Sequence, residues 1–174
     1  ITPDIVTMGK PMANGIPCSA MAIKADVLDA FAESNPYFNT FAGNPVSMAA
    51  AQAVLDYIRQ NDILMHTQNM GEKLRNTVSD IAKAHPRLAD VRGAGLFNGV
   101  EIVKPGTKTP DRPFAVSLIE ELRKNHVLIS LCGPYGNVLK VRPPLVFDDA
   151  DLDMFASALE ASLTKLEKTA EHPQ

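Results

Sequence analysis

The feature that most constrains the fold of this chain is a short apolar run near its first residue that ends abruptly at a glycine, a lysine and a proline. Ile5 to Met8 has the length and composition of a buried strand, and it stops at Gly9-Lys10-Pro11. Pro11 disfavours helical dihedral angles at Lys10, and the nearby glycines allow a tight backbone that can lie against a flat ligand. The sequence therefore predicts one lysine presented at the end of a buried strand.

A lysine held out of water at such a place favours covalent chemistry. A free lysine side chain titrates near pH 10.4, so roughly one in 2,500 is neutral at pH 7, and only the neutral amine condenses with an aldehyde. Desolvation raises the neutral fraction, so we expect Lys10 to be shielded from solvent. The residue types alone also fit an ordinary solvated turn, and this alternative stays open.

Composition narrows the class of partner. The chain has 174 residues, 45% of them hydrophobic, which is enough for one domain or for one domain and part of another. A formal charge of −3 argues against nucleic acid. Without a leader or a long apolar run, we expect no membrane contact and a cytoplasmic location. We expect buried, reduced thiols and no metal site, because the spacing of the cysteines and histidines fits neither a disulfide framework nor a ligand set: Cys18, Cys132, His66, His85, His126 and His172.

Strands and helices are predicted along the rest of the chain. A strand at residues 19–24 and a helix at 25–33 come first. Asn44 and Pro45 then start a helix, residues 46–59, that is apolar on nearly every face and should be buried. Beyond a break at residues 61–62, helices are expected at 63–84 and 114–124 and strands at 88–92, 96–103, 127–131 and 138–142. A last helix begins after Asp148, and its tail should fray from Glu167.

Three stretches of the sequence together resemble the class III, pyridoxal-phosphate-dependent aminotransferases of fold type I. They are residues 3–17, residues 38–45 and residues 133–147. In that family the matching lysine forms the Schiff base with the cofactor, so the resemblance implies pyridoxal 5'-phosphate and a catalytic, cofactor-binding Lys10. It also implies an α/β fold, with residues 1–61 ending a large cofactor-binding domain and residues 62–174 forming a small C-terminal α/β domain of mixed or antiparallel sheet.

The second stretch implies a cofactor-binding threonine. The family's threonine at the position of Thr40 reaches the cofactor phosphate of the neighbouring subunit, so the resemblance implies a homodimer. A hydroxyl can donate to a phosphate oxygen, and a loop ahead of a helix N-terminus favours anions. By composition alone, Thr40 equally well braces its own loop.

The third stretch implies a substrate-binding arginine. Arg142 stands where the family commonly receives a substrate carboxylate, which an arginine binds through two parallel hydrogen bonds. Strand alternation puts Lys140 and Arg142 on one face. The alternative is an ion pair between Arg142 and Asp148 or Asp149. Arg92 is a weaker candidate, either on the substrate side or bracing the domain.

The resemblance implies transfer of an amino group from an amine or amino acid to a keto acid. Two alternatives stand beside it. The Gly-Lys-Pro-Met-x-Asn-Gly and Gly-Pro-Tyr-Gly-Asn forms of the motifs also resemble the phospho-lyase branch, which eliminates phosphate from a phosphorylated amine. The family's aspartate for the pyridine nitrogen and its phosphate loop precede the lysine segment, so we expect a longer parent chain and consider an inactive fragment or interaction module the second alternative.

Overall fold

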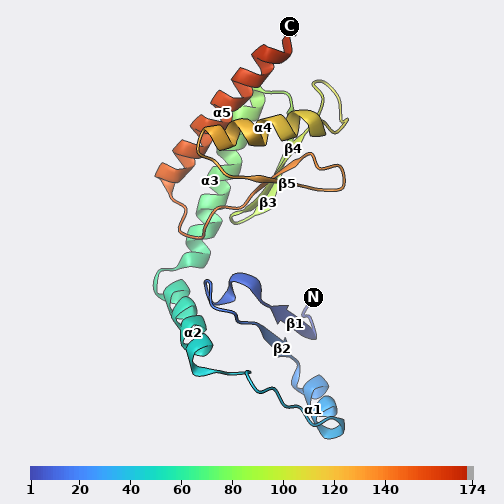
Figure 1. Cartoon of the computed structure of the whole chain (residues 1–174), viewed down its shortest axis with the longest axis vertical. Coiled ribbons are helices and arrows are strands. Elements are labelled where there is room, and N and C mark those ends of the chain that lie inside the picture. Colours follow the sequence, from blue (N-terminus) through green and yellow to red (C-terminus); the bar gives the residue numbers. More distant parts are fainter. Residues whose placement is uncertain (172–174) are drawn as a thin grey trace. The chain divides into compact units, whose positions relative to one another are not determined.

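The chain forms two compact units, one spanning Ile1–Asp62 and the other beginning at Ile63. The computed structural model describes residues 1–171, and Figure 1 shows the elements along them. The division lies next to the break expected at residues 61–62. The assignment of each unit to a domain of a larger fold stays a prediction.

The first unit has a two-stranded sheet and two helices. Strand β1 (Ile5–Met8) pairs antiparallel with β2 (Ala20–Ile23), and the short 3-10 helix η1 (Lys10–Met12) lies between them. Helices α1 (Ala25–Ser34) and α2 (Pro45–Gln60) follow. The predicted start of α2 is confirmed, because the Asn44 side chain accepts a hydrogen bond of 2.9 Å from the Ser47 amide.

The burial predicted for this unit is wrong. All four residues of β1 are exposed, and α2 buries only Ser47 and Ala51. The physical reason is that a strand becomes buried only when layers cover both of its faces. Within the unit, β1 pairs with β2 alone. The apolar side chains of β1 therefore have no core of their own to enter.

The second unit is a four-stranded antiparallel sheet with three helices. The strand order is β3-β4-β6-β5, so the antiparallel form of the predicted sheet is the one observed. The strands are β3 (Leu88–Ala94), β4 (Phe97–Ile102), β5 (Ser130–Cys132) and β6 (Val138–Val141). The helices are α3 (Ile63–Ala84), α4 (Arg112–Lys124) and α5 (Asp149–Glu171), and α3 has the predicted bounds.

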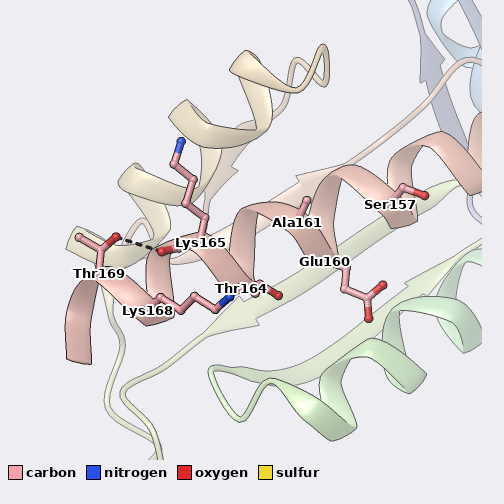
Figure 2. Close-up of a pocket in the computed structure, with 7 residues that line it drawn as sticks. All are labelled: Ser157, Glu160, Ala161, Thr164, Lys165, Lys168 and Thr169. Atoms are coloured by element: carbon pink, nitrogen blue, oxygen red, sulfur yellow. Dashed lines mark hydrogen bonds between the residues drawn. The ribbon is translucent and has the colours of Figure 1, made fainter. Parts of the chain in front are cut away.

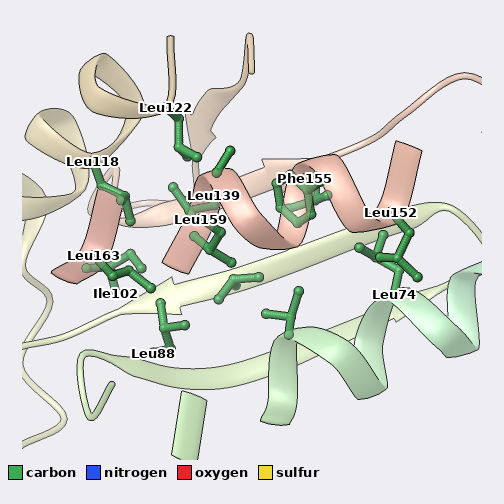
Figure 3. Packing of buried hydrophobic residues seen from close by; sticks show 14 of the residues in the cluster. Leu74, Leu88, Ile102, Leu118, Leu122, Leu139, Leu152, Phe155, Leu159 and Leu163 are labelled. Carbon is green, nitrogen blue, oxygen red and sulfur yellow. The ribbon is translucent and has the colours of Figure 1, made fainter. Parts of the chain in front are cut away.

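A single apolar core joins the helices to one face of this sheet. Figure 3 shows side chains from α3, α4 and α5 meeting those of the strands. Six of the large side chains are completely buried, and they come from four different elements: Ile102, Leu118, Leu122, Leu139, Leu159 and Leu163. Along β4, buried residues alternate with less buried ones. The opposite face of the sheet is therefore the more open one within this unit.

Helix α3 approaches the turn between β3 and β4 closely at two glycines. A Cβ atom added to Gly71 would lie 2.0 Å from the carbonyl oxygen of Gly95, so only glycine fits there. Gly95 itself has a φ of 51°, which favours glycine. The Arg75 guanidinium donates to the Gly95 carbonyl at 3.1 Å and to the Asn98 side chain at 3.0 Å. The two glycines therefore allow α3 to pack closely against this turn.

Two predicted boundaries are wrong at the far end of the chain. Strand β5 starts at Ser130 and not at residue 127, because its first partner on β6 is the Lys140 that faces Ser130. Helix α5 continues through Glu167 to Glu171. The reason is that Glu167 pairs with the buried His85 at 2.8 Å. That contact holds the last turns of α5 against the residue that follows α3.

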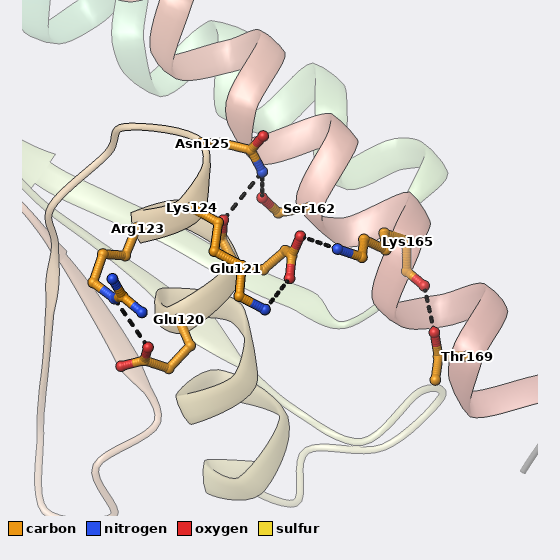
Figure 4. Close-up of polar contacts among 8 residues, drawn as sticks. All are labelled: Glu120, Glu121, Arg123, Lys124, Asn125, Ser162, Lys165 and Thr169. Atoms are coloured by element: carbon orange, nitrogen blue, oxygen red, sulfur yellow. Dashed lines mark hydrogen bonds and ion pairs between the residues drawn. The ribbon is translucent and has the colours of Figure 1, made fainter.

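Polar contacts join α4 to α5 at the edge of the core. Figure 4 shows the Glu121 carboxylate between the amines of Lys165 and Lys124, and the Asn125 amide donating to the Ser162 hydroxyl at 3.1 Å. The hydrogen bonds from Lys165 and then Lys124 lower the pKa of Glu121 below its ordinary value.

Among residues 1–171, no helix combines the length and the hydropathy that crossing a bilayer requires.

Candidate active site

Lys10 lies just beyond the end of β1, at the first position of η1. Its φ is 52°, a left-handed conformation that costs free energy in a residue with a side chain and that is common at functional sites. Its amine makes no ion pair or hydrogen bond with any described residue. Lys24, the other lysine of the first unit, instead binds Asp4 at 2.6 Å. Lys10 is therefore the unit's unengaged amine.

The expected shielding of Lys10 from solvent is wrong for the described residues. Lys10 is exposed, as is the strand before it. The cause is the same as for β1, since no layer of the first unit covers this end of the sheet. Within residues 1–171 the chain therefore presents the amine without supplying the apolar surroundings that would raise its neutral fraction.

Thr40 is held in position by its neighbours and does not brace the loop itself. The Asn39 side chain accepts hydrogen bonds from the amides of Phe41 at 3.1 Å and Ala42 at 3.2 Å, and the Asn44 side chain donates to the Phe41 carbonyl at 3.2 Å. The Thr40 hydroxyl makes no hydrogen bond within residues 1–171 and is exposed. The bracing role considered for Thr40 thus belongs to two asparagines, leaving its hydroxyl available as a donor.

Sequence reasoning missed these two side chains as loop residues. The signal was present in Asn39, because asparagine commonly accepts hydrogen bonds from backbone amides two residues ahead in a turn. The third missed residue is Asn137, at the end of the Gly-Pro-Tyr-Gly-Asn motif. It is buried, and its amide donates to the Ile102 carbonyl at 2.8 Å. This asparagine therefore joins the β5–β6 turn to β4 and has a structural role.

Arg142 follows the last residue of β6 and is exposed. The alternative of an ion pair with Asp148 or Asp149 is wrong. Asp149 pairs with Lys73 at 2.6 Å, and Asp148 accepts a hydrogen bond from the Asp151 amide at 3.1 Å at the start of α5. Arg142 makes no ion pair among the described residues. Its guanidinium is therefore open to an anionic ligand.

Arg92, the weaker candidate, is already engaged. It binds the carboxylates of Asp90 and Glu101, and the hydrogen bond that it donates to Asp90 is the largest cause that raises the pKa of Arg92. All three residues belong to β3 and β4. Arg92 thus ties two neighbouring strands together, which fits the bracing alternative.

The histidines and cysteines form no metal site among residues 1–171. His66 contacts the Phe147 carbonyl through its Nε2 atom at 2.8 Å, and His85 pairs with Glu167. His172 lies outside the described residues. Both cysteines are free thiols, but they are half-buried and not buried as expected. Neither lies within an apolar core, because the segments that carry them border on exposed loops.

Two hollows in the second unit differ in how many elements line them. The first, shown in Figure 2, is lined by seven residues that all belong to α5. It is a shallow groove along one helix, and no side chains from a second element approach a ligand there. The second is lined by residues from three separate segments of the second unit, including Arg142. Lys10 and Thr40 belong to the first unit and Arg142 to the second.

Comparisons with known proteins identify the family of this chain. The profile of the class III aminotransferases matches residues 1–163, so the chain belongs to that family. Its mixed α/β architecture matches solved transaminases of fold type I, among them an S-selective transaminase from Arthrobacter with a TM-score of 0.87 at 26% identity over 99% of this chain and 40% of that one. Enzymes of this family depend on pyridoxal 5'-phosphate.

Particular relatives carry out two kinds of reaction. An ethanolamine-phosphate phospho-lyase homologue from Caenorhabditis elegans is 42% identical over 95% of this chain and 36% of its own length. A 5-aminovalerate aminotransferase from Pseudomonas putida is 32% identical over 95% of this chain and 39% of its own. The structure of an Arthrobacter phospholyase in complex with phosphoethanolamine has a TM-score of 0.91 at 45% identity, over 94% of this chain and 39% of that one. The chain thus spans well under half the length of these relatives.

Proposed function

We propose that the protein containing this chain is a pyridoxal-phosphate-dependent enzyme acting on a small amine, and that Lys10 is the residue that bonds to the cofactor. The observation that carries the proposal is the unengaged amine of Lys10, held at the end of β1 in a left-handed backbone conformation. Residues 1–61 are then the end of the large cofactor-binding domain, and residues 62–174 are the small C-terminal domain.

The residues of this chain fit the lysine side of a cofactor site. When bound, the cofactor supplies an aldehyde that captures amines and a pyridine ring that accepts electrons from the substrate carbon. Lys10 would hold the cofactor through its amine, and the same amine would move a proton at the substrate carbon. The Thr40 hydroxyl donates to a cofactor phosphate oxygen.

Arg142 completes the proposed set by binding the anionic end of the substrate. Its guanidinium is exposed and has no carboxylate partner within residues 1–171, whereas a structural arginine such as Arg92 has two. A planar guanidinium binds carboxylate or phosphate oxygens through two parallel hydrogen bonds. The residue therefore orients the substrate and takes no part in the bond changes.

Two reactions are compatible with these roles. Amino-group transfer from an amine or amino acid to a keto acid follows from membership of the family. Elimination of phosphate from a phosphorylated amine is supported by identities of 42% with a phospho-lyase homologue and 45% with a phospholyase, beside 32% with the aminovalerate aminotransferase. We therefore propose the phospho-lyase reaction first and amino-group transfer as the second candidate.

The experiment for Lys10 uses the full-length protein. The wild type should show the visible absorbance of lysine-bound pyridoxal phosphate, and Lys10→Ala should lose both this absorbance and activity, by about a thousandfold or more. Lys24→Ala is the matched control, because Lys24 already pairs with Asp4, and it should keep both. An unchanged spectrum in Lys10→Ala contradicts the proposal.

The two reactions differ in what they consume. Phosphoethanolamine incubated with the full-length protein should release inorganic phosphate without any keto acid if the phospho-lyase proposal is right. Amino-group transfer requires a keto acid and leaves the phosphate ester intact. If no phosphate is released and an amino group is transferred to the keto acid, the phospho-lyase proposal is wrong and the aminotransferase proposal is supported.

We expect the 174-residue chain alone to bind the cofactor more weakly than the full-length protein does. We propose weak or no stoichiometric binding of pyridoxal phosphate by it, because Lys10 is exposed and the pyridine-nitrogen partner of the family precedes the matched segment. We also propose a homodimer, in which Thr40 serves the partner's cofactor, and a cytoplasmic location. Sedimentation of the full-length protein tests the dimer, and Thr40→Ala should weaken cofactor binding about tenfold.

A further inference from the structure

Two asparagine-glycine pairs occur in the sequence, and the structure places them in opposite surroundings. They are Asn14-Gly15 in the first unit and Asn98-Gly99 on β4 of the second. Asparagine is one of the thermolabile side chains of proteins. A following glycine favours loss of its amide group, because glycine has no side chain to hinder the attack of its own backbone nitrogen. Both pairs have the same chemistry, so their surroundings decide which of them reacts.

Asn14 and Gly15 form a tight two-residue turn directly after η1. Their φ angles are 48° and 109°, and the Ile16 amide closes the turn by donating to the Ala13 carbonyl at 3.3 Å. Positive φ angles at both central residues are typical of a turn in which asparagine and glycine are favoured. The closing bond is longer than the usual length of about 2.9–3.0 Å. The turn can therefore open readily and let the Gly15 nitrogen rotate toward the Asn14 side chain.

Both reacting groups of this turn are accessible. Asn14 and Gly15 are exposed, and a Cβ atom added to Gly15 would meet nothing within 4 Å. Among residues 1–171, the Asn14 side chain makes no hydrogen bond and the Gly15 amide donates none. The side-chain carbonyl carbon and the attacking nitrogen are therefore both free of contacts that would hold them, and water reaches them.

The second pair is held in the middle of a sheet. Asn98 is 5% exposed, its side-chain oxygen accepts a hydrogen bond from Arg75 at 3.0 Å, and its side-chain nitrogen donates to the Gly95 carbonyl at 3.1 Å. Strand β4 pairs with β3 on one side and with β6 on the other, which fixes the backbone at Gly99. Attack by the Gly99 nitrogen would first require these buried hydrogen bonds to break, which costs free energy.

We propose that Asn14 is a site of spontaneous deamidation and that Asn98 is protected from it. The Gly15 nitrogen forms a bond to the Cγ atom of Asn14, the bond from Cγ to the side-chain nitrogen breaks, and ammonia leaves with the proton of the Gly15 amide. Water then opens the cyclic imide at either of its carbonyls. The products are aspartate and isoaspartate, in which the chain continues through the side-chain carbon.

The modification changes the charge of the segment that carries the proposed cofactor lysine. Lys10 is the only charged side chain between Asp4 and Lys24. A carboxylate at position 14 therefore cancels the formal charge of this segment. The isoaspartate product also lengthens the backbone of the turn that follows η1. The reaction itself needs none of the roles proposed for Lys10, so it can be tested apart from them.

The test incubates the full-length protein in warm, mildly alkaline buffer and maps its peptides by mass spectrometry over time. Replacing the amide nitrogen by oxygen adds about 1 Da, and fragmentation separates aspartate from isoaspartate. Deamidation at Asn14 should be about 100-fold faster than at Asn98 or more, because Asn98 reacts only after the sheet has opened. Both products should appear at position 14, as opening of an imide requires.

Two controls assign the difference to the structure. In concentrated urea the two pairs should react at rates within about threefold of each other, because unfolding removes their different surroundings. Asn14→Gln should lose the mass gain at this position, because its longer side chain closes a ring less readily. Equal rates at Asn14 and Asn98 in the folded protein would overturn the proposal. So would an Asn14 that stays intact in the folded protein while the unfolded protein reacts.

Discussion

The two units of this chain use apolar residues in opposite ways. In the second unit, the apolar stripes of α4 and α5 enter a common core in which Leu118 and Leu159 are completely buried. In the first unit, the apolar side chains of β1 stay at the surface, with Ile5 49% and Val6 40% exposed. The difference teaches that an apolar pattern predicts burial only where the covering layer belongs to the same unit.

The residues that stabilise the fold and the residues proposed for chemistry lie mostly in different units. The second unit carries its own core and its polar ties, such as those of Glu121 and His85. The first unit carries the unengaged Lys10 and Thr40, ordered by turns and asparagine side chains. We therefore expect substitutions to have large effects on stability in one unit and small effects in the other.

The largest effect is expected from a core substitution in the second unit. Leu159→Ala should lower the free energy of unfolding of that unit by about 2–5 kcal/mol, because it removes completely buried methyl groups and leaves a cavity. Urea unfolding followed by circular dichroism measures the change. Leu145→Ala, at an exposed position of the same unit, is the control and should change it by less than about 0.5 kcal/mol. A loss below 1 kcal/mol for Leu159→Ala would mean that this core is loosely packed.

For one glycine substitution, the sign of the change in the free energy of unfolding tests the packing of the second unit. Helix propensity alone predicts that Gly71→Ala stabilises α3 by about 1 kcal/mol. The structure predicts a net loss of about 1–3 kcal/mol, because the new Cβ would meet the Gly95 carbonyl oxygen. Thermal unfolding of the chain decides between the two signs. Ser79→Ala, on the exposed side of α3, should show the small gain that propensity predicts.

The pH dependence of unfolding tests the contact between α4 and α5. The pKa of Glu121 is lowered in the folded state, so the folded chain resists taking up a proton that the unfolded chain accepts. The stabilisation is therefore present above the ordinary glutamate pKa and is lost as the pH falls through the lowered one. Glu121→Gln should be less stable than the wild type near pH 7, and the difference should shrink on acidification. A difference independent of pH would exclude this origin.

The matched control for that measurement is the neighbouring glutamate. Glu120→Gln removes an exposed contact with Arg123 within one helix, which contributes at most about 0.5 kcal/mol. Its pH profile should follow that of the wild type more closely than the profile of Glu121→Gln does.

The smallest effect is expected in the first unit. Phe41 is 81% exposed, so Phe41→Ala should change the free energy of unfolding of the 174-residue chain by less than about 0.5 kcal/mol. The same substitution in the full-length protein can break the comparison. A loss of about 3 kcal/mol or more there would mean that residues outside this chain bury the ring.

The candidate site was predicted unevenly by the sequence. Lys10 was chosen from the local signals of glycine and proline and from the family resemblance, whereas Thr40 and Arg142 were chosen from the resemblance alone. Whether Arg142 was paired could not be read from the sequence, because Asp148 and Asp149 have several possible partners within reach. The neighbours of Lys140 were also hidden, since strand register decides which residues of β4 and β5 face it.

The sequence by itself determined where helices start, which faces of α3, α4 and α5 are apolar, and where one lysine follows a strand. These properties depend on residues close together in the chain, so periodicity and capping report them. Only the tertiary structure decided that β1 and Lys10 are exposed, that β5 begins at Ser130, and that Asn14 is exposed where Asn98 is buried. Burial, strand register and ion pairing depend on residues distant in the sequence, and their contacts are set by the packing of the whole unit.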